Sequence, residues 1–269
     1  MDGEREQRYL RMLVEPIRVC AEYRPKLGHG REGGMSLADF QALYRSDPFY
    51  AWFGLDHPLM YAAHKAAGGM TSIYRQIGIG CERLFRQILQ DQLGLTQEES
   101  KWSYTTKAAR RRVRTLSLDG RIPLDAVRDE GRRGVVADWI AQVAHDLKVN
   151  PSIIRALRGI VFEVRQGYKS KDSKRQNADL ANAATAYSQA YLPCALILST
   201  QIDEDIVSRY RSERWAILTG RLAGASATDS TYLFLREIIG YDLASFLERH
   251  AAALQQEVAR LLEVLLRAE

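Results

Sequence analysis

The stretch that decides the fold is Val161 to Asp179, which reads V-F-E-V-R-Q-G-Y-K-S-K-D-S-K-R-Q-N-A-D. At its start Phe162 and Val164 alternate with Glu163 and Arg165, and side chains on a β-strand point alternately to its two faces. The pattern therefore predicts a half-buried strand that holds a carboxylate on a rigid edge. The cations around Asp172 are Arg165, Lys169, Lys171, Lys174 and Arg175. Such a cluster can bind a polyanion beside the acid, which points to phosphodiester chemistry.

The same region also allows a helix. The apolar residues Ile153, Ile154, Leu157, Ile160, Val161 and Val164 fit one face of a helix from Pro151 to Arg165, which would remove the strand. Gly159 lies inside that run, and glycine weakens a helix by about 1 kcal/mol. The sequence I-V-F-E-V also suits a pleated surface. We therefore expect a strand at 159–166.

Periodicity, caps and turn residues extend this interpretation to the whole chain. We expect helices at 5–24, 36–46, 58–67, 70–93, 132–147, 173–190, 230–239 and 241–267, a short helix after Asn150-Pro151, and strands at 113–122, 159–166, 192–199 and 214–219. This order predicts an α/β (α+β) fold with a mixed central sheet flanked by helices. We expect a single domain over 1–269, with a helical N-terminal part at 1–70, a catalytic core at 77–220 and C-terminal helices at 230–269.

Composition is compatible with a nucleic-acid partner but does not require one. The chain has 269 residues, a formal charge of +5 and a pI near 9.1, with cations concentrated in the opening stretch, at 107–114 and at 128–133. Cys20, Cys81 and Cys194 are far apart and lie among apolar neighbours, as expected of reduced thiols. The longest apolar run, 192–198, is too short to cross a bilayer, and the N-terminus lacks the apolar core of a signal peptide. We expect a soluble, cytoplasmic protein.

Several enzyme classes are disfavoured. Gly28, Gly30 and Gly33 have GxGxxG spacing, but they follow a polar segment and not a strand, so a dinucleotide site is not expected. The five histidines show no metal-ligand spacing, and no CxxC pair, GxSxG, Walker lysine loop or HExxH motif occurs. Zinc proteolysis, ATP hydrolysis and acyl transfer are therefore not favoured.

Hydrolysis of a phosphodiester needs an activated water, a stabilised leaving oxygen and neutralised phosphoryl charge, and carboxylates that hold Mg²⁺ can meet all three needs. The candidate acids are Glu163 on its strand, Asp119 before Gly120 at the end of an earlier strand, and Glu82 on the preceding helix. Asp119 and Glu163 are the expected metal ligands. Each acid also has a structural interpretation: Glu82 as a solvated surface acid, Asp119 in an Asp-Gly turn, and Glu163 in a salt bridge with Arg165.

The cations divide into catalytic and binding candidates. Arg165 faces the same side as Glu163 and is expected to touch the scissile phosphate. Lys169 or Lys171 could orient the attacking water, or could only bind backbone phosphate. The expected nucleic-acid contacts are Arg110, Arg111, Arg112, Lys171, Lys174, Arg175, Gln176 and Asn177.

The order of helix with Glu82, strand end with Asp119, strand F-E-V-R, basic helix start and buried strand L-P-C-A-L-I-L-S resembles the core of the PD-(D/E)xK nucleases. The segment V-R-Q-G-Y-K-S-K-D-S-K-R-Q-N-A-D-L is similar to stretches of bacterial type II restriction endonucleases. The resemblance covers about 77–200. It implies a restriction-endonuclease-like core and a Mg²⁺-dependent endonuclease that acts on double-stranded DNA as a homodimer. Asp119 and Glu163 would be its metal ligands.

The chain departs from this family pattern in two places. The family's lysine, two residues after the acid, is Arg165 here, so Lys169 or Arg165 itself would have to take that role. The long gap between Asp119 and Glu163 requires a helical insertion. Asp172-Ser173-Lys174 spells D-x-K in a second register, but its hydrophilic context does not suit a core strand.

Two other functions remain open. The chain could be a non-catalytic, mostly helical DNA- or RNA-binding regulator in which Glu163 only pairs with Arg165. It could also be an enzyme of small phosphorylated metabolites that uses the basic loop as an anion nest. The sequence does not reveal a recognition sequence, because that depends on which side chains meet base edges.

Overall fold

The computed structural model of this chain describes residues 2–27, 33–107, 113–167 and 182–267. The chain divides into two compact units, one formed by Met1–Gly80 with Glu248–Glu269 and the other by Cys81–Leu247. The long helix α4 contributes residues to both. The single endonuclease domain expected from the sequence stays a prediction, and the two units are described separately.

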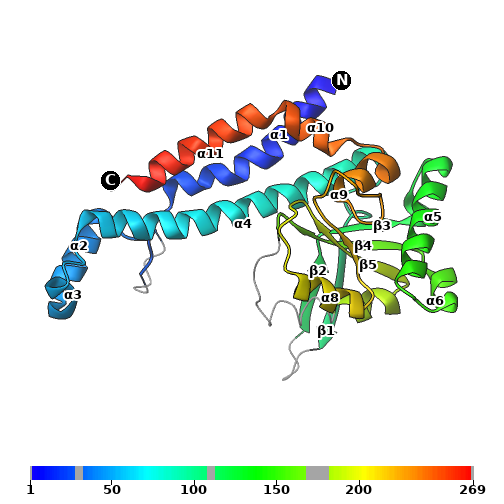
Figure 1. Ribbon diagram of the computed structural model, residues 1–269, viewed down its shortest axis with the longest axis horizontal. Coiled ribbons are helices and arrows are strands. Elements are labelled where there is room, and N and C mark those ends of the chain that lie inside the picture. The colour runs from blue at the N-terminus through cyan, green and yellow to red at the C-terminus, as the bar shows by residue number, and fades with distance from the viewer. Residues whose placement is uncertain (1, 28–32, 108–112, 168–181, 268–269) are drawn as a thin grey trace. The chain divides into compact units, whose positions relative to one another are not determined.

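The first unit is helical. Its elements are α1 (Asp2–Arg18), η1 (Val19–Glu22), α2 (Leu37–Ser46), α3 (Pro48–Trp52), the first part of α4 (Pro58–Leu93), and α11 (Ala251–Leu266). Helices α1 and α11 lie side by side (Figure 1). Their buried core contains Ile17, Cys20, Ile73, Leu261 and Leu265.

Helix α4 is continuous over 36 residues, so the expected break between 67 and 70 is wrong. Gly68 and Gly69 lie inside this helix, and each leaves room for a neighbour. A Cβ on Gly68 would lie 1.9 Å from the Tyr23 hydroxyl oxygen, and a Cβ on Gly69 would lie 2.5 Å from Leu265 Cδ2. The glycines therefore serve packing, and the expected end of the helix at Gly94, with φ +71°, is confirmed.

The second unit contains the sheets. Its elements are the remainder of α4, β1 (Trp102–Lys107), β2 (Val113–Leu118), β3 (Gly120–Pro123), η3 (Leu124–Ala126), α5 (Glu130–Asp146), α6 (Pro151–Ala156), β4 (Gly159–Arg165), β5 (Tyr191–Ile197), α8 (Glu204–Ser212), β6 (Ala216–Leu218), α9 (Thr231–Leu233), the π-helical η4 (Phe234–Ile239) and most of α10 (Leu243–Arg249). Residues 182–188 are also helical. The fold is thus mixed α/β, as expected.

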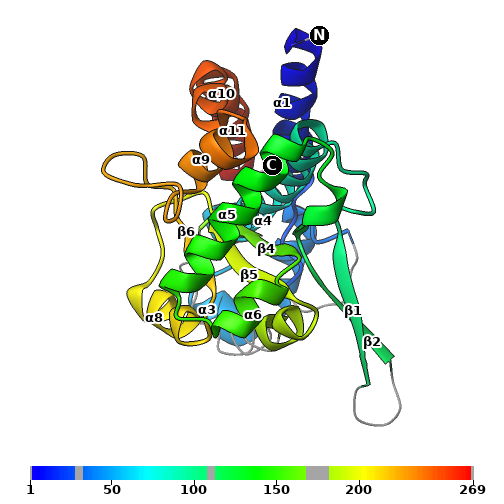
Figure 2. The ribbon, with the colours of Figure 1, turned by 90° about the vertical axis from the view of Figure 1, so that its right-hand side faces the viewer.

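The described strands form a four-stranded sheet in the order β3-β4-β5-β6 and a separate antiparallel hairpin, β1-β2. Strand β3 is antiparallel to β4, whereas β4, β5 and β6 are mutually parallel. The hairpin extends beyond the edge of the four-stranded sheet (Figure 2). Because three strands run in one direction, their carboxyl ends meet at one edge of the sheet.

Strand β4 is buried on both faces and not half-buried as the sequence indicated. On one face Phe162 packs against Phe85 of α4 and Phe234 of η4, with ring centroids 4.9 and 5.8 Å apart. On the other face Val161 belongs to a cluster with Ala195 and with Ile206 of α8. Helices therefore cover both sides of the sheet, which is the layered arrangement that parallel strands require.

The remaining differences from the sequence prediction have local causes. The helix proposed for Pro151 to Arg165 is wrong, because α6 ends at Ala156 and β4 begins at Gly159, where a Cβ would lie 2.2 Å from the Ile122 carbonyl oxygen. The expected helix at 241–267 is interrupted at His250. Strand β1 and helix α8 were not expected. Among the described residues, no helix is long and apolar enough to cross a lipid bilayer.

Candidate active site at the edge of strands β3 and β4

Asp119 directly precedes β3 and hydrogen-bonds to both chain neighbours of Glu163 on β4. Gly120 pairs with Phe162 in the antiparallel register, and the Asp119 amide donates to the Phe162 carbonyl oxygen at 2.8 Å. The register ends at Gly120: Asp119 lies in a bend before β3, and its bond to Phe162 departs from the one-to-one pairing of the ladder. The fold thus brings together the two acids that were expected to bind metal.

The Asp119 carboxylate also completes the hydrogen bonding of the sheet. Its Oδ2 accepts from the Val164 amide at 2.8 Å. In a regular ladder that amide would donate to the backbone carbonyl of residue 118. Leu118 instead pairs with Trp102 in the hairpin, so the chain changes sheets at Asp119 and the side chain supplies the acceptor. This bond fixes the orientation of the carboxylate.

Glu163 is a buried acid with a cationic neighbour on its own strand. Its relative exposure is 7%, and its Oε1 pairs with Arg165 Nη2. The two residues face β5 at Ala195 and Ile197, both buried and apolar. A carboxylate in such surroundings is costly to bury unless it is paired, and the Arg165 guanidinium offsets that cost. The salt bridge that the sequence offered as the structural alternative to a catalytic role is present.

Gly120 is required for packing and not for a turn. Its φ is not positive, so any residue could adopt its backbone conformation. A Cβ there would lie 2.7 Å from Phe85 Cε1, closer than real contacts allow. The structure therefore requires a hydrogen-bond acceptor at position 119. Independently, it requires a residue without a Cβ at position 120, which leaves space for Phe85.

Glu82 lies on α4 one helical turn before Arg86. Residues four apart on a helix occupy the same face, and Arg86 Nη1 donates to the Asp119 carbonyl oxygen at 3.1 Å. Glu82 is therefore on the side of α4 that faces Asp119 and Glu163. Its neighbour Cys81 has its pKa raised to about 12, by burial first and by the negative charge of Glu82 second.

Asp119 and Glu163, here called the acidic pair, match a magnesium site in the type of side chain and in the number of carboxylates. Mg²⁺ is usually held by one or two carboxylates and completes its shell with water and substrate phosphate oxygens. Within the described ranges there is no group of three or more His, Cys, Asp or Glu side chains arranged to hold a metal ion. A cation held by Asp119 and Glu163 would share Glu163 with Arg165.

The carboxyl end of the parallel strands supplies polar groups that the sequence did not single out. Ser199 follows β5; its hydroxyl accepts from the Gln201 amide at 3.0 Å, and its carbonyl accepts from the Gly220 amide at 3.2 Å. Gly167, which follows β4, packs beside Ser199, because a Cβ there would lie 3.5 Å from Ser199 Cβ. Ligands of open α/β sheets bind at this end. A polar residue directly after a buried strand is the signal that could have identified Ser199.

The predicted cationic contacts lie outside the described residues: Arg110, Arg111, Arg112, Lys169, Lys171, Lys174, Arg175, Gln176 and Asn177. Their described flanks are β1 and β2 for the first three, and β4 and the helical residues 182–188 for the others. Two hydrogen bonds tie the hairpin to the segment 182–189. Tyr104 donates to Asn182 Oδ1 at 2.6 Å, and Trp102 Nε1 donates to Gln189 Oε1 at 3.0 Å.

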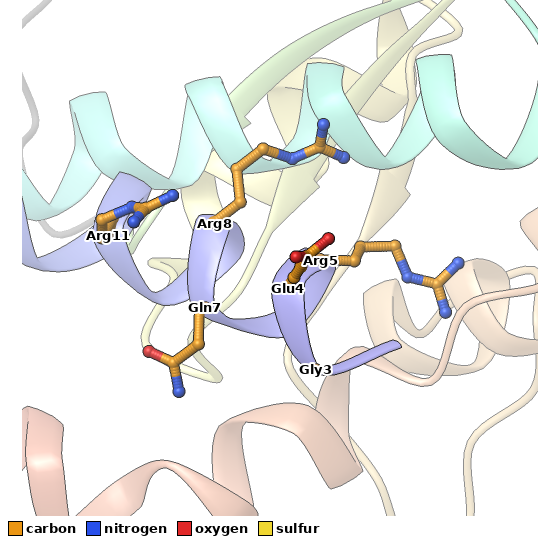
Figure 3. A pocket seen from close by; sticks show the side chains of 6 residues that line it. All are labelled: Gly3, Glu4, Arg5, Gln7, Arg8 and Arg11. Carbon is orange, nitrogen blue, oxygen red and sulfur yellow. The ribbon is translucent and has the colours of Figure 1, made fainter. Parts of the chain in front are cut away.

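The helical unit has a concentration of cations of its own. Arg5, Arg8 and Arg11 on α1 line a cavity of about 680 Å³ together with Gly3, Glu4 and Gln7. Figure 3 shows Arg5 and Arg8 extending to one side of the helix while Gln7 extends to the other. Three cations against one acid make this the positive part of the opening stretch that the composition indicated.

Comparisons of the chain with protein-family models, with curated proteins and with solved structures found no match. The resemblance to PD-(D/E)xK nucleases therefore stays a prediction from the residues.

Proposed function

We propose that this protein is a Mg²⁺-dependent type II restriction endonuclease, which hydrolyses phosphodiester bonds in double-stranded DNA at a specific sequence. The observation that carries the proposal is the placement of Asp119 beside Glu163, because Asp119 bonds to Phe162 and Val164 on either side of it. Two carboxylates held against one rigid strand give the fixed geometry that a catalytic metal site needs. Buried acids that cost stability are also common at functional sites.

Each residue would have a distinct part in the reaction. Asp119 and Glu163 would hold Mg²⁺, which supplies charge stabilisation at the phosphoryl oxygens and an acidified water. Arg165 would neutralise Glu163 in the free protein and donate to a phosphate oxygen in the complex. Glu82, on the face of α4 that points toward Asp119 and Glu163, would be the third acid of the site. Lys169 would be the second candidate for the cation that orients the attacking water.

The DNA would be bound by cations in several segments. The connection between β1 and β2 contains Arg110, Arg111 and Arg112, and a two-stranded β-ribbon is one of the elements that fits the major groove. Lys171, Lys174 and Arg175 would contact backbone phosphates, with Gln176 and Asn177 next to them. We also propose a homodimer, because two-fold protein symmetry matches a palindromic site.

We also propose a cytoplasmic location for the protein. The supporting observation is that Cys20, Cys81 and Cys194 are free thiols. Free thiols suit the reducing environment of the cytosol.

A second function is favoured by a specific observation. Both carboxylates already have protein partners, since Glu163 pairs with Arg165 and Asp119 accepts from the Val164 amide. A non-catalytic DNA- or RNA-binding regulator would use the acids in this structural way alone. It would bind nucleic acid with strong salt dependence and without any requirement for a metal.

Incubation of the purified protein with plasmid DNA and Mg²⁺ separates the two functions. The nuclease proposal expects discrete fragments, whose ends can be sequenced, over a range of salt concentrations and methylation states. If the protein is a regulator, we expect the DNA to stay intact and to migrate more slowly in a gel. Adding a chelator should not change this binding. Intact DNA under all of these conditions would reject the nuclease proposal.

A further inference from the structure

Helices α2 and α3 and the residues that lead into α4 carry an exposed apolar surface, here called the aromatic hairpin (residues 37–59). Its rings are largely solvent-accessible: Phe49 is 57% exposed, Tyr50 41%, Trp52 82% and Phe53 68%. Leu59, at the start of α4, is 69% exposed. Scattered apolar residues are normal on a surface, but a contiguous group of this kind marks an interaction site.

The exposed rings continue from a buried aromatic core. Phe40 is fully buried, and its ring lies 4.3 Å from that of Tyr44, which stacks on Tyr50 at 5.1 Å. Phe49 contacts Tyr50 at 5.8 Å and Phe53 at 5.1 Å between ring centroids. The rings therefore form one connected series, buried at one end and exposed at the other.

Polar contacts hold the aromatic hairpin in this conformation. Ser36 and Asp39 form a capping box at the start of α2, and the Asp47 carboxylate accepts from the first amides of α3. Arg45 Nε donates to Asp56 Oδ2 at 2.7 Å, and Gln41 Nε2 donates to the Asp56 carbonyl oxygen at 3.1 Å. A surface that is already rigid loses little entropy on binding. The exposed rings are therefore preorganised for a partner.

The charges around the aromatic hairpin argue against a polyanionic partner. Residues 36–59 contain one cation, Arg45, and three acids, Asp39, Asp47 and Asp56, whereas the whole chain carries +5. Nucleic-acid backbones and anionic lipid surfaces need a positive surface. The acids here are occupied as caps or as the partner of Arg45. A protein surface that is itself apolar fits this region better.

The exposed area corresponds to one half of a small symmetric interface. An aromatic side chain presents about 200 Å², so the four rings at these exposures offer roughly 500 Å² per copy. Two such faces would remove roughly 1,000 Å² from water, about the minimum for a specific interface. We propose that the aromatic hairpin binds the same surface of a second copy of this chain. Flat rings can stack on their own symmetry mates, as an isologous contact requires.

The chain contains its own reporter for this contact. Of the four tryptophans, Trp102, Trp139 and Trp215 are buried and Trp52 is exposed. Quenching of tryptophan emission by acrylamide therefore reports mainly on Trp52. As protein concentration rises, we expect Trp52 to become protected from the quencher, because association would cover the exposed rings. Neither DNA nor Mg²⁺ is present, so the result is independent of the proposed nuclease function.

Two matched variants decide whether the aromatic hairpin is the interface. Phe53→Asp keeps the Trp52 reporter and should shift protection to at least tenfold higher protein concentration, since central aromatic residues dominate such contacts. Leu222→Asp, at a 52% exposed leucine of the sheet-containing unit, should leave it unchanged. Circular dichroism checks that both variants are folded, and sedimentation velocity follows Trp52→Asp, which lacks the reporter.

Four results would overturn the proposal: no protection at any attainable concentration, equal protection in parent and Phe53→Asp, protection that needs single-stranded DNA, or protection that needs lipid vesicles. The last two would assign the rings to stacking on bases or to a membrane surface.

Discussion

The edge of β3 and β4 and the aromatic hairpin depart from the usual distribution of side chains in opposite ways. At the sheet edge, charged groups are buried: Glu163 is 7% exposed and sits beside Arg165 and Asp119. In the aromatic hairpin, large rings are exposed, and Trp52 retains 82% of its accessible surface. Soluble domains generally place these residue types the other way round.

The two departures differ in how the fold compensates for them. The charged groups have partners, because Glu163 pairs with the Arg165 guanidinium and the Asp119 carboxylate accepts from the Val164 amide. The exposed rings have their inner neighbours, Phe40 and Tyr44, but the described part of the chain leaves their outer faces open to solvent. A compensated buried charge points to chemistry inside the protein, whereas an uncovered apolar surface points to a contact outside it.

The largest effect is expected from Asp119→Asn. The asparagine oxygen can still accept from the Val164 amide, so the fold should be kept while the charge that would hold Mg²⁺ is lost. We expect DNA cleavage to fall on the order of 100-fold or more, the scale seen when a group that stabilises transition-state charge is removed. Initial rates on plasmid DNA measure this. A rate equal to that of the parent would remove Asp119 from the site.

Arg165→Met should destabilise the fold by about 3 kcal/mol, because it leaves Glu163 buried without its partner. Urea unfolding followed by tryptophan emission measures the change. The double variant Glu163→Gln/Arg165→Met should recover most of the loss, since an amide costs less to bury than a carboxylate. The single variants Glu163→Gln and Arg165→Met provide the control. If their changes in the free energy of unfolding simply summed to that of the double variant, the ion pair would not be the reason that Glu163 is tolerated.

The effect of Mg²⁺ on the melting temperature tests whether Asp119 and Glu163 bind a cation. If the acidic pair holds the cation, Mg²⁺ should raise the melting temperature of Arg165→Met more than that of the parent, because it replaces the missing positive charge. Equal shifts in the two proteins would argue for a purely structural pair.

Gly120→Ala should cost about 1–3 kcal/mol through overpacking against Phe85. Phe85→Leu in the same chain should recover part of the loss, because it removes the ring atom that lies 2.7 Å from the added carbon. Thermal unfolding of the single and double variants tests this. No recovery would mean that Gly120 is needed for its backbone and not for space.

The smallest effect concerns pH at the aromatic hairpin. The hydrogen bond from Arg45 lowers the pKa of Asp56 below its ordinary value. The contact is therefore complete above the ordinary carboxyl pKa and is lost as pH falls through the lowered one. We expect Trp52 protection to weaken modestly over that acidic range in the parent and to be weaker and less pH-dependent in Asp56→Asn. Identical pH profiles for the two would separate the Arg45–Asp56 contact from the interface.

Much of the fold could be predicted from local pattern. The strand at Glu163, the cap at Ser36 and the helix end at Gly94 depend on neighbours in sequence, and all three are present. The continuity of α4 could not be predicted, because Gly68 and Gly69 make room for Tyr23 and Leu265, which are distant in sequence.

The candidate site was predictable in its members but not in its geometry. The alternation around Glu163 and the Asp-Gly pair marked both acids, yet only the structure shows that Asp119 bonds to the two residues that flank Glu163. Burial of β4 on both faces was missed because its polar residues, Glu163 and Arg165, satisfy each other. When two polar residues on one face of a strand pair with each other, their alternation in the sequence is the same as that of a strand with one face exposed to solvent.

The single-turnover rate of DNA cleavage in Mg²⁺ tests the central claim most directly. Parent, Glu163→Gln and the control Glu213→Gln, at an exposed glutamate after α8, would be compared on a duplex that contains the mapped cleavage site. The account predicts cleavage by the parent and the control, and intact but still bound DNA with Glu163→Gln. Cleavage by Glu163→Gln at the parental rate would contradict it.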